Sequence, residues 1–359
     1  MKSVYIHIPF CNSICSYCDF CKFLNDDKWA NIYLEELEKE IKEFYENDRI
    51  KTIYIGGGTP SALSYKNLNK LFDIIKLFRT EIGCEFTFEC NVNDICVELL
   101  SLLANNGVNR LSIGVESFDK TNLEFLNRKH TKEGIIEKIR LAKRYFKNIN
   151  VDLIYALPCE NMHTFKKDVS EILKLDITHI STYSLIIEEH TKIYNKGVKP
   201  IDEETDYKMY KYICKKLAKN GYVHYEVSNF AKEGYQSKHN LTYWCNNEYY
   251  GFGLGAHGYL NHMRYENTRN FTKYLKGEYR LNELVESTRE EMENELILGL
   301  RKLKGVDISE FHKKFLVDIK NVFKLDEAIQ KGYLILEDGF LRISEDKIYI
   351  MNEIINMIM

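Results

Sequence analysis

The chain has 359 residues and nearly balanced charge, with 50 Lys and Arg against 53 Asp and Glu and a formal net charge of −3. Hydrophobic residues make up 45% of it, enough for one large domain or two smaller ones to bury a core. Without a basic excess, composition gives no reason to expect a nucleic-acid partner. No run approaches the roughly 18 apolar residues that span a bilayer, and Met1–Phe10 is too short for a signal peptide. We therefore expect a cytoplasmic protein whose 10 cysteines are mostly free thiols.

The first half of the chain alternates short β-branched or aromatic runs with stretches rich in Lys and Glu. We expect strands at Val4–Ile8, Thr52–Ile55, Glu85–Phe88, Arg110–Val115, Asn150–Ile154 and His179–Ser184. We expect helices at Ala30–Tyr45, Tyr65–Phe78, Val97–Asn105, Glu133–Tyr145 and Phe165–Leu173. Strands joined by crossover helices form a parallel sheet, so the pattern predicts an α/β fold, either doubly wound or an incomplete barrel.

The second half changes in character. A helix is expected at Asp206–Asn220 and a strand at Tyr222–Ser228, followed by a loop rich in Gly and aromatic residues at Asn246–Tyr259. Further helices at Glu290–Leu303, Ile308–Phe315 and Leu325–Lys331 precede two short strands, Leu334–Glu337 and Leu341–Ser344, around a type I′ turn at Asp338-Gly339. These predict a small winged-helix-like module. It lacks a basic recognition helix, so a capping role is favoured over DNA contact.

Four cysteines lie within eleven residues, in the run Cys11-Asn-Ser-Ile-Cys15-Ser-Tyr-Cys18-Asp-Phe-Cys21 directly after the first predicted strand. Three thiolates at these spacings can hold three corners of an iron–sulfur cluster and leave one iron open for chemistry. Zinc also binds such cysteine pairs, with Cys21 as a fourth ligand. The cysteine spacing alone favours neither the iron–sulfur cluster nor the zinc site.

Other candidate residues fall where predicted strands end. The turn Gly56-Gly57-Gly58-Thr59-Pro60 follows one strand, and glycines let a ligand lie directly against the backbone. Glu89, Glu116 and Asp152 lie at or near the ends of others. In a parallel barrel the functional residues gather at the carboxyl ends of the strands.

With these motifs in place, the chain resembles the radical SAM superfamily. More closely, it resembles the branch that contains anaerobic coproporphyrinogen III oxidase and the HemW haem chaperones. The matching stretches are Tyr5–Cys11, Tyr17–Phe20, Gly56–Pro60, Asn109–Val115, Asp152–Pro158, Tyr183–Leu185, Tyr225–Ala231, His239–Trp244 and Gly251–His257.

This resemblance implies an incomplete (β/α)6 parallel barrel with a smaller C-terminal winged-helix-like module. It implies a 4Fe–4S cluster on Cys11, Cys15 and Cys18, with S-adenosylmethionine (SAM) on the open iron. It also implies cofactor-binding roles for Tyr5, Tyr17, Gly57, Gly58, Thr59, Glu89, Glu116, Arg128 and Asp152. We expect domains at 1–220 (the SAM barrel), 221–285 (a family-specific extension) and 286–359 (the C-terminal module).

Two features favour the chaperone over the oxidase. The oxidase is expected to be a longer chain with an extension ahead of the cysteine loop, whereas only ten residues precede Cys11 here. The oxidase also carries a cysteine at the position of Phe20. The implied function is to bind haem and transfer it to recipient haem proteins, with peripheral membrane contact and oligomeric state left open. The alternative is an enzyme that decarboxylates coproporphyrinogen III.

Haem also needs a site. His239 lies beside Tyr243 and Trp244 in a motif shared with HemW, and we hypothesise that it contributes to haem binding. Three departures from the family pattern are Cys21, Glu116 in place of the usual Gln, and Ala156 in place of the usual Gly.

Overall fold

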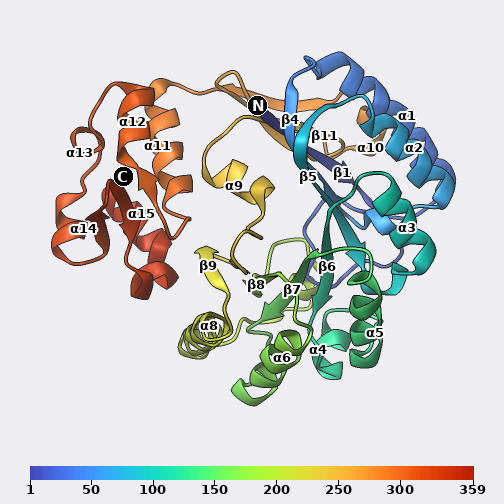
Figure 1. The fold of residues 1–359 in the computed structure, drawn as a ribbon, viewed down its shortest axis with the longest axis horizontal. Coiled ribbons are helices and arrows are strands. Elements are labelled where there is room, and N and C mark those ends of the chain that lie inside the picture. Colours follow the sequence, from blue (N-terminus) through green and yellow to red (C-terminus); the bar gives the residue numbers. More distant parts are fainter.

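The computed structural model describes all residues from 1 to 359, and a single twelve-stranded sheet dominates it (Figure 1). The strands are ordered β14-β13-β12-β11-β1-β4-β5-β6-β7-β8-β10-β9, and β14 and β9 at the two ends do not pair, so the barrel is incomplete. The six central strands, all parallel, are β1 (Lys2–Ile8), β4 (Arg49–Gly57), β5 (Arg79–Asn91), β6 (Arg110–Glu116), β7 (Asn148–Tyr155) and β8 (His179–Ser184). Each predicted strand of the first half is therefore confirmed.

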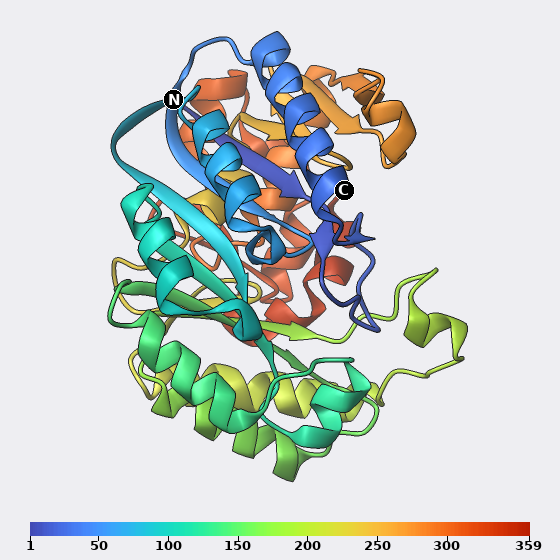
Figure 2. The same cartoon turned by 90° about the vertical axis from the view of Figure 1, so that its right-hand side faces the viewer.

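Helices cover the outer face of these strands (Figures 1 and 2). They are α1 (Asp27–Phe44), α2 (Tyr65–Ile75), α3 (Val97–Asn105), α4 (Lys120–Phe125), α5 (Lys132–Ala142), α6 (Met162–Lys174) and α8 (Glu203–Ala218), with α7 (Lys192–Asn195) in the connection after β8. Side-chain caps begin most of them; Asn161, for example, caps α6 with a reciprocal bond to Thr164. The five helices predicted in the first half are confirmed, with ends shifted by a few residues.

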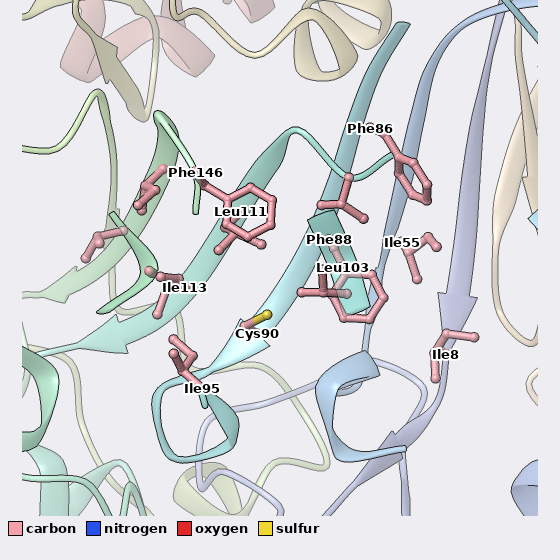
Figure 3. Close-up of a cluster of buried hydrophobic side chains, with 14 of the residues drawn as sticks. Ile8, Ile55, Phe86, Phe88, Cys90, Ile95, Leu103, Leu111, Ile113 and Phe146 are labelled. Carbon is pink, nitrogen blue, oxygen red and sulfur yellow. The ribbon is translucent and has the colours of Figure 1, made fainter. Parts of the chain in front are cut away.

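The alternation of side chains along the strands explains the two faces of the sheet. Residues such as Ile55, Phe88 and Ile113 point outward and form a continuous core with the helices (Figure 3). The intervening residues point inward and are largely polar; Asn150 on β7, for example, bonds Ser112 on the adjacent strand β6 at 2.8 Å. Because strand side chains alternate with period two, the same sequence pattern that builds the core lines the interior with polar groups.

The strands after α8 extend the sheet at both edges. They are β9 (Val223–Glu226) and β10 (Asn229–Ala231) beside β8, and β11 (Tyr249–Phe252), β12 (His257–Leu260), β13 (Met263–Asn267) and β14 (Arg280–Val285) beside β1. The short helices α9 (Lys238–Trp244) and α10 (Phe271–Tyr274) lie in their connections. The predicted helix and strand around Gly221 are confirmed.

The prediction of a loop at 246–259 is wrong, because β11 and the start of β12 occupy much of this segment. Gly251 is part of β11 and packs so closely on the next strand that a Cβ there would lie 1.7 Å from the His257 carbonyl oxygen. Glycine here serves close strand packing, not a turn, and composition alone does not separate the two uses.

The C-terminal segment has a core of its own, formed by residues from Leu296 to Ile358. Its helices are α11 (Thr288–Gly299), α12 (Ile308–Phe315), α13 (Ile319–Val322), α14 (Asp326–Gln330) and α15 (Met351–Ile358), and its small sheet is β15 (Val306–Asp307), β17 (Phe340–Ile343) and β16 (Leu334–Glu337). Asp338 and Gly339 both have positive φ, 51° and 80°, as a type I′ turn requires. The predicted C-terminal module is therefore present. None of the helices in the chain has the length and apolar character needed to cross a bilayer.

Candidate functional site: a cysteine loop over the open barrel

The cysteine loop leaves the barrel after β1 and returns toward α1. Two short strands, β2 (Phe10–Cys11) and β3 (Phe23–Leu24), pair in parallel and close its base. The Ser16 amide and hydroxyl donate to the carbonyls of Leu126 and Phe125 at 3.2 and 2.6 Å, so the loop is attached to the segment after α4. Backbone pairing and the Ser16 side chain together therefore hold the loop over the carboxyl ends of the strands.

Cys11, Cys15 and Cys18 are all free thiols, and all three line one cavity of 450 Å³. Burial raises the pKa of each thiol, that of Cys18 to about 11. Metal ligation needs thiolates, so an incoming cationic cluster must displace these protons. No three His, Cys, Asp or Glu side chains lie close enough together in this structure to hold a single metal ion.

The glycine turn packs directly against the first of these cysteines. Gly58 and Thr59 donate backbone bonds to Ile8 and Phe10 at 2.9 and 2.8 Å. A Cβ on Gly58 would lie 2.9 Å from the Ile8 carbonyl oxygen and 3.0 Å from the Cys11 sulfur, and the Thr59 hydroxyl donates to that sulfur at 3.4 Å. Only glycine lets this turn approach the cysteine so closely. The turn also leaves part of its backbone on the cavity wall.

Two carboxylates lie on the inner wall of the same cavity. Glu89 accepts from the Tyr54 hydroxyl at 2.7 Å and from the Gly57 amide at 3.1 Å, and burial raises its pKa. Burial, with the nearby Glu116 and Glu89 carboxylates, raises the pKa of Asp152 to about 7. A cluster of carboxylates held apart from water in this way is suited to receive hydroxyl and amine donors or positive charge.

Glu116 and Arg128 form a buried ion pair beside the cysteine loop. Glu116, with φ of 69°, ends β6 and accepts from the Arg128 guanidinium, which also donates to the Tyr17 hydroxyl at 2.9 Å. The carboxylate that replaces the family's usual Gln is therefore neutralised within the chain. Arg128 connects the end of β6 to the cysteine loop.

The cavity contains eleven of the residues selected from the sequence. They are Cys11, Cys15, Tyr17, Cys18, Gly57, Gly58, Thr59, Glu89, Glu116, Arg128 and Asp152. Two of its buried polar atoms, Asn91 Oδ1 and Arg128 Nε, have no partner within the protein. One unpaired acceptor and one unpaired donor in the same cavity fit a polar ligand such as SAM. Sequence reasoning missed Tyr54, although its place two residues before the glycine turn puts it on the inner face.

Two of the residues selected from the sequence, Tyr5 and His239, do not line this cavity. Tyr5 lines a second cavity and its hydroxyl bonds His7 Nδ1 at 3.0 Å. His239, on α9, is buried inside the barrel, where its Nδ1 bonds the Thr52 hydroxyl at 2.7 Å and its Nε2 bonds the Tyr243 hydroxyl at 2.8 Å. Burial lowers the pKa of His239 to about 3, so the ring stays neutral. Neither of its nitrogens is free to bind a ligand in this arrangement.

Cys21 also faces the second cavity. It lines that cavity but not the one that holds the other three thiols. Its thiol points to the Arg269 carbonyl at 3.8 Å, and its own carbonyl bonds His7 Nε2 at 2.8 Å. The geometry therefore separates Cys21 from the three-cysteine set.

The fold and the cysteine-lined cavity define a radical SAM protein. The family model "Radical SAM superfamily" matches residues 5–172, and the model "HemN C-terminal domain" matches residues 287–346. Membership of this superfamily implies a 4Fe–4S cluster and SAM. Coproporphyrinogen III oxidase (HemN) from Escherichia coli, a radical SAM enzyme, matches with a TM-score of 0.87 over 99% of this chain and 89% of its own. At 19% identity, that match shows the shared fold.

Relatives that are similar over nearly the whole chain show which family within this superfamily the chain belongs to. The heme chaperone HemW of Lactococcus lactis is 44% identical, over 93% of this chain and 90% of that protein. The HemW of Bacillus subtilis is 39% identical, over 98% and 96%, and that of Escherichia coli is 30% identical, over 99% and 97%. The chain belongs to the HemW family.

Proposed function

We propose that this chain is a haem chaperone that binds haem and transfers it to recipient haem proteins. The observation that carries the proposal is full-length similarity to proteins named heme chaperone HemW, at up to 44% identity. Phe20, at the position where the oxidase has a further cysteine, lies on the loop between two cavities and is 61% exposed. It therefore presents an apolar ring at the mouth of both.

In this proposal Cys11, Cys15 and Cys18 hold the 4Fe–4S cluster, which supplies one-electron chemistry at SAM when both are bound. The glycine turn at Gly57–Gly58 offers backbone without Cβ to the amino-acid end of SAM. The polar wall of the cavity, with Glu89 and Asp152, offers acceptors to its hydroxyls and compensates its positive charge. Arg128 orients Tyr17 on the cluster loop. These residues bind and orient the cofactors and limit access of water.

The direct test is haem binding and transfer by the protein reconstituted with its cluster under anaerobic conditions. Ferric haem should give a saturable Soret band, and the loaded protein should convert an apo-haem protein to its holo form. Absence of a saturable band would overturn the proposal. Conversion of coproporphyrinogen III to protoporphyrinogen in the presence of SAM would establish the oxidase alternative instead.

The cysteine assignment has its own matched set of variants. Cys11→Ser, Cys15→Ser and Cys18→Ser should each lose most of the iron and acid-labile sulfide after reconstitution. Cys21→Ser, on the other cavity, and Cys159→Ser, at an exposed position, should keep both. Loss of the cluster in Cys21→Ser would show that this thiol is a ligand.

A further inference from the structure

The interior of the barrel contains a buried arginine that has no partner in the protein. Arg110 lies on β6, and its side chain is 1% exposed. Leu111 and Ile113, which follow it on the strand, pack into the outer core (Figure 3), so alternation points Arg110 and Ser112 into the barrel. The Arg110 guanidinium takes part in no hydrogen bond or ion pair with the protein, and its Nε is fully buried. Arginines that serve only to stabilise a core are normally hydrogen-bonded, so Arg110 needs another explanation.

The register of β5 and β6 places Arg110 between two carboxylates. Arg110 lies opposite Thr87, whose hydroxyl is also buried and unpaired. Glu85 and Glu89 lie two residues before and after Thr87, on the same inner face of β5. Strand geometry puts their backbone positions roughly 8 Å from that of Arg110. Arg110 forms an ion pair with neither, so its charge acts on both from a distance.

The two carboxylates differ in what they face. Glu85 accepts from the backbone amides of Lys238 and His239 at 3.1 and 3.0 Å, and it does not line the cavity that contains the three cluster cysteines. Glu89 does line that cavity, which we call the SAM cavity. The charge of Arg110 therefore reaches the SAM cavity through Glu89.

Glu89 has other carboxylates beside it but few cations. Glu116 on β6 and Asp152 on β7 line the same cavity, and Arg128, the other arginine there, is already paired with Glu116. Burial raises the pKa of Glu89, whereas its hydrogen bonds and the charge of Arg110 lower it. The remaining titratable groups around Glu89 are tyrosines of β1, β4, β8 and α9, namely Tyr5, Tyr54, Tyr183 and Tyr243. Arg110 is thus the unpaired cation that favours the ionised form of Glu89.

We propose that Arg110 is a positioning residue of the SAM site: its buried charge keeps Glu89 ionised, and so able to accept from the SAM hydroxyls and to balance the sulfonium charge. Arg110 acts through Glu89, because it does not itself line the cavity. The inference rests on the SAM site proposed above and is independent of haem transfer.

The test is equilibrium dialysis of SAM against the full-length, cluster-loaded protein under anaerobic conditions, from pH 6 to 9. Arg110→Met and Arg110→Gln both remove the charge, one with an apolar and the other with a polar side chain. Each should weaken SAM binding about fivefold or more at pH 7 and move the midpoint of its pH dependence up by about one unit, because Glu89 then keeps its proton to higher pH.

Two variants serve as controls. Arg110→Lys keeps the positive charge and should retain both the affinity and the pH midpoint. Arg140→Met, at an exposed position on α5, should behave as the unaltered protein. The amino group of SAM titrates equally with every variant, so a difference between variants reports on the protein. Neither neutral replacement breaks a hydrogen bond of Arg110, so both should fold, with unchanged circular dichroism and iron content.

The outcomes separate this inference from the SAM site itself. If the unaltered protein binds SAM and the neutral variants keep its affinity and pH midpoint, Arg110 has no positioning role while the SAM site stands. If Arg110→Lys loses as much affinity as Arg110→Met, with no shift of the midpoint in either, Arg110 acts by packing and the inference is also overturned. If the unaltered protein binds no SAM, the SAM site fails.

Discussion

Ala156 has φ of 60°, in the left-handed region that favours glycine, at the turn after β7 where the family usually has Gly. An L residue there costs about 1–2 kcal/mol, and the greater freedom of glycine in the unfolded chain returns part of that. Ala156→Gly should therefore raise the free energy of unfolding by about 0.5–1 kcal/mol, measured by urea denaturation. Ala142→Gly, at a buried position in α5, should lower it. A loss of stability in Ala156→Gly would show that the Ala156 methyl packs favourably enough to outweigh the strain.

The Glu116–Arg128 ion pair is also a feature of single residues. It is buried, and Glu116 departs from the family pattern. Glu116→Ala leaves the Arg128 charge without its partner and should cost about 3 kcal/mol. Glu116→Gln also removes the negative charge but keeps an acceptor for the guanidinium, so it should cost less, about 2 kcal/mol. Urea denaturation of the cluster-free protein measures both.

The exposed pair Lys120–Glu124 provides the control. Glu124→Ala should change stability by less than about 0.5 kcal/mol, because solvent screens an exposed pair. Equal losses in Glu116→Ala and Glu124→Ala would mean that burial adds nothing to the Glu116–Arg128 interaction.

At the scale of elements, the contact between the β4 turn and β2 joins the two parts of the cofactor site. Gly58→Ala places a methyl group against the Ile8 carbonyl and the Cys11 sulfur. Over-packing of this kind costs about 1–3 kcal/mol, and relief requires β2 to move away with its cysteine. The variant should lose at least half of its iron and sulfide after reconstitution. Gly134→Ala, where a Cβ meets nothing closer than 3.4 Å, should reconstitute fully. Full reconstitution of Gly58→Ala would show that the turn does not constrain the cluster loop.

At the scale of the whole molecule, buried titratable groups of two kinds set the pH dependence of stability. Burial raises the pKa of Asp152 and Glu226 to about 7 and of Glu160 to about 8. These folded values exceed the unfolded ones, so the folded chain binds more protons and its stability falls as pH rises toward 8. Buried histidines act in the opposite sense; burial lowers the pKa of His7, His130 and His224 to about 4 and of His239 to about 3. Below about pH 6 the unfolded chain therefore binds more protons there.

The two effects together predict a stability maximum near about pH 6 for the cluster-free protein, with a decline of up to about 1 kcal/mol per pH unit between pH 7 and 8. Urea midpoints from pH 5 to 8 measure it. Glu160→Gln should flatten the upper part of the decline, and Glu137→Gln, at an exposed position, should not. Stability that rises steadily from pH 6 to 8 would contradict the raised carboxyl pKa values.

Much of the fold was predictable because its signals are local. β-branched runs such as Arg110–Val115 separated by amphipathic helices predicted the six parallel strands, and Asp338-Gly339 predicted the hairpin. The cysteine spacing and the glycine turn likewise predicted a common site, because the carboxyl ends of parallel strands meet at one edge of the sheet. The strands at 249–260 were missed because glycine serves close packing and turns alike.

What the sequence by itself determined is therefore the period of the strands, the identity of the thiols and glycines, and the family that their order resembles. Tertiary structure alone decided which cavity each residue faces. It placed Cys21 away from the other three thiols and bonded His239 to Thr52 across 187 positions of the chain. The reason is physical: side-chain alternation is a property of a few residues, whereas a cavity forms only when the curvature of the whole sheet brings distant segments together.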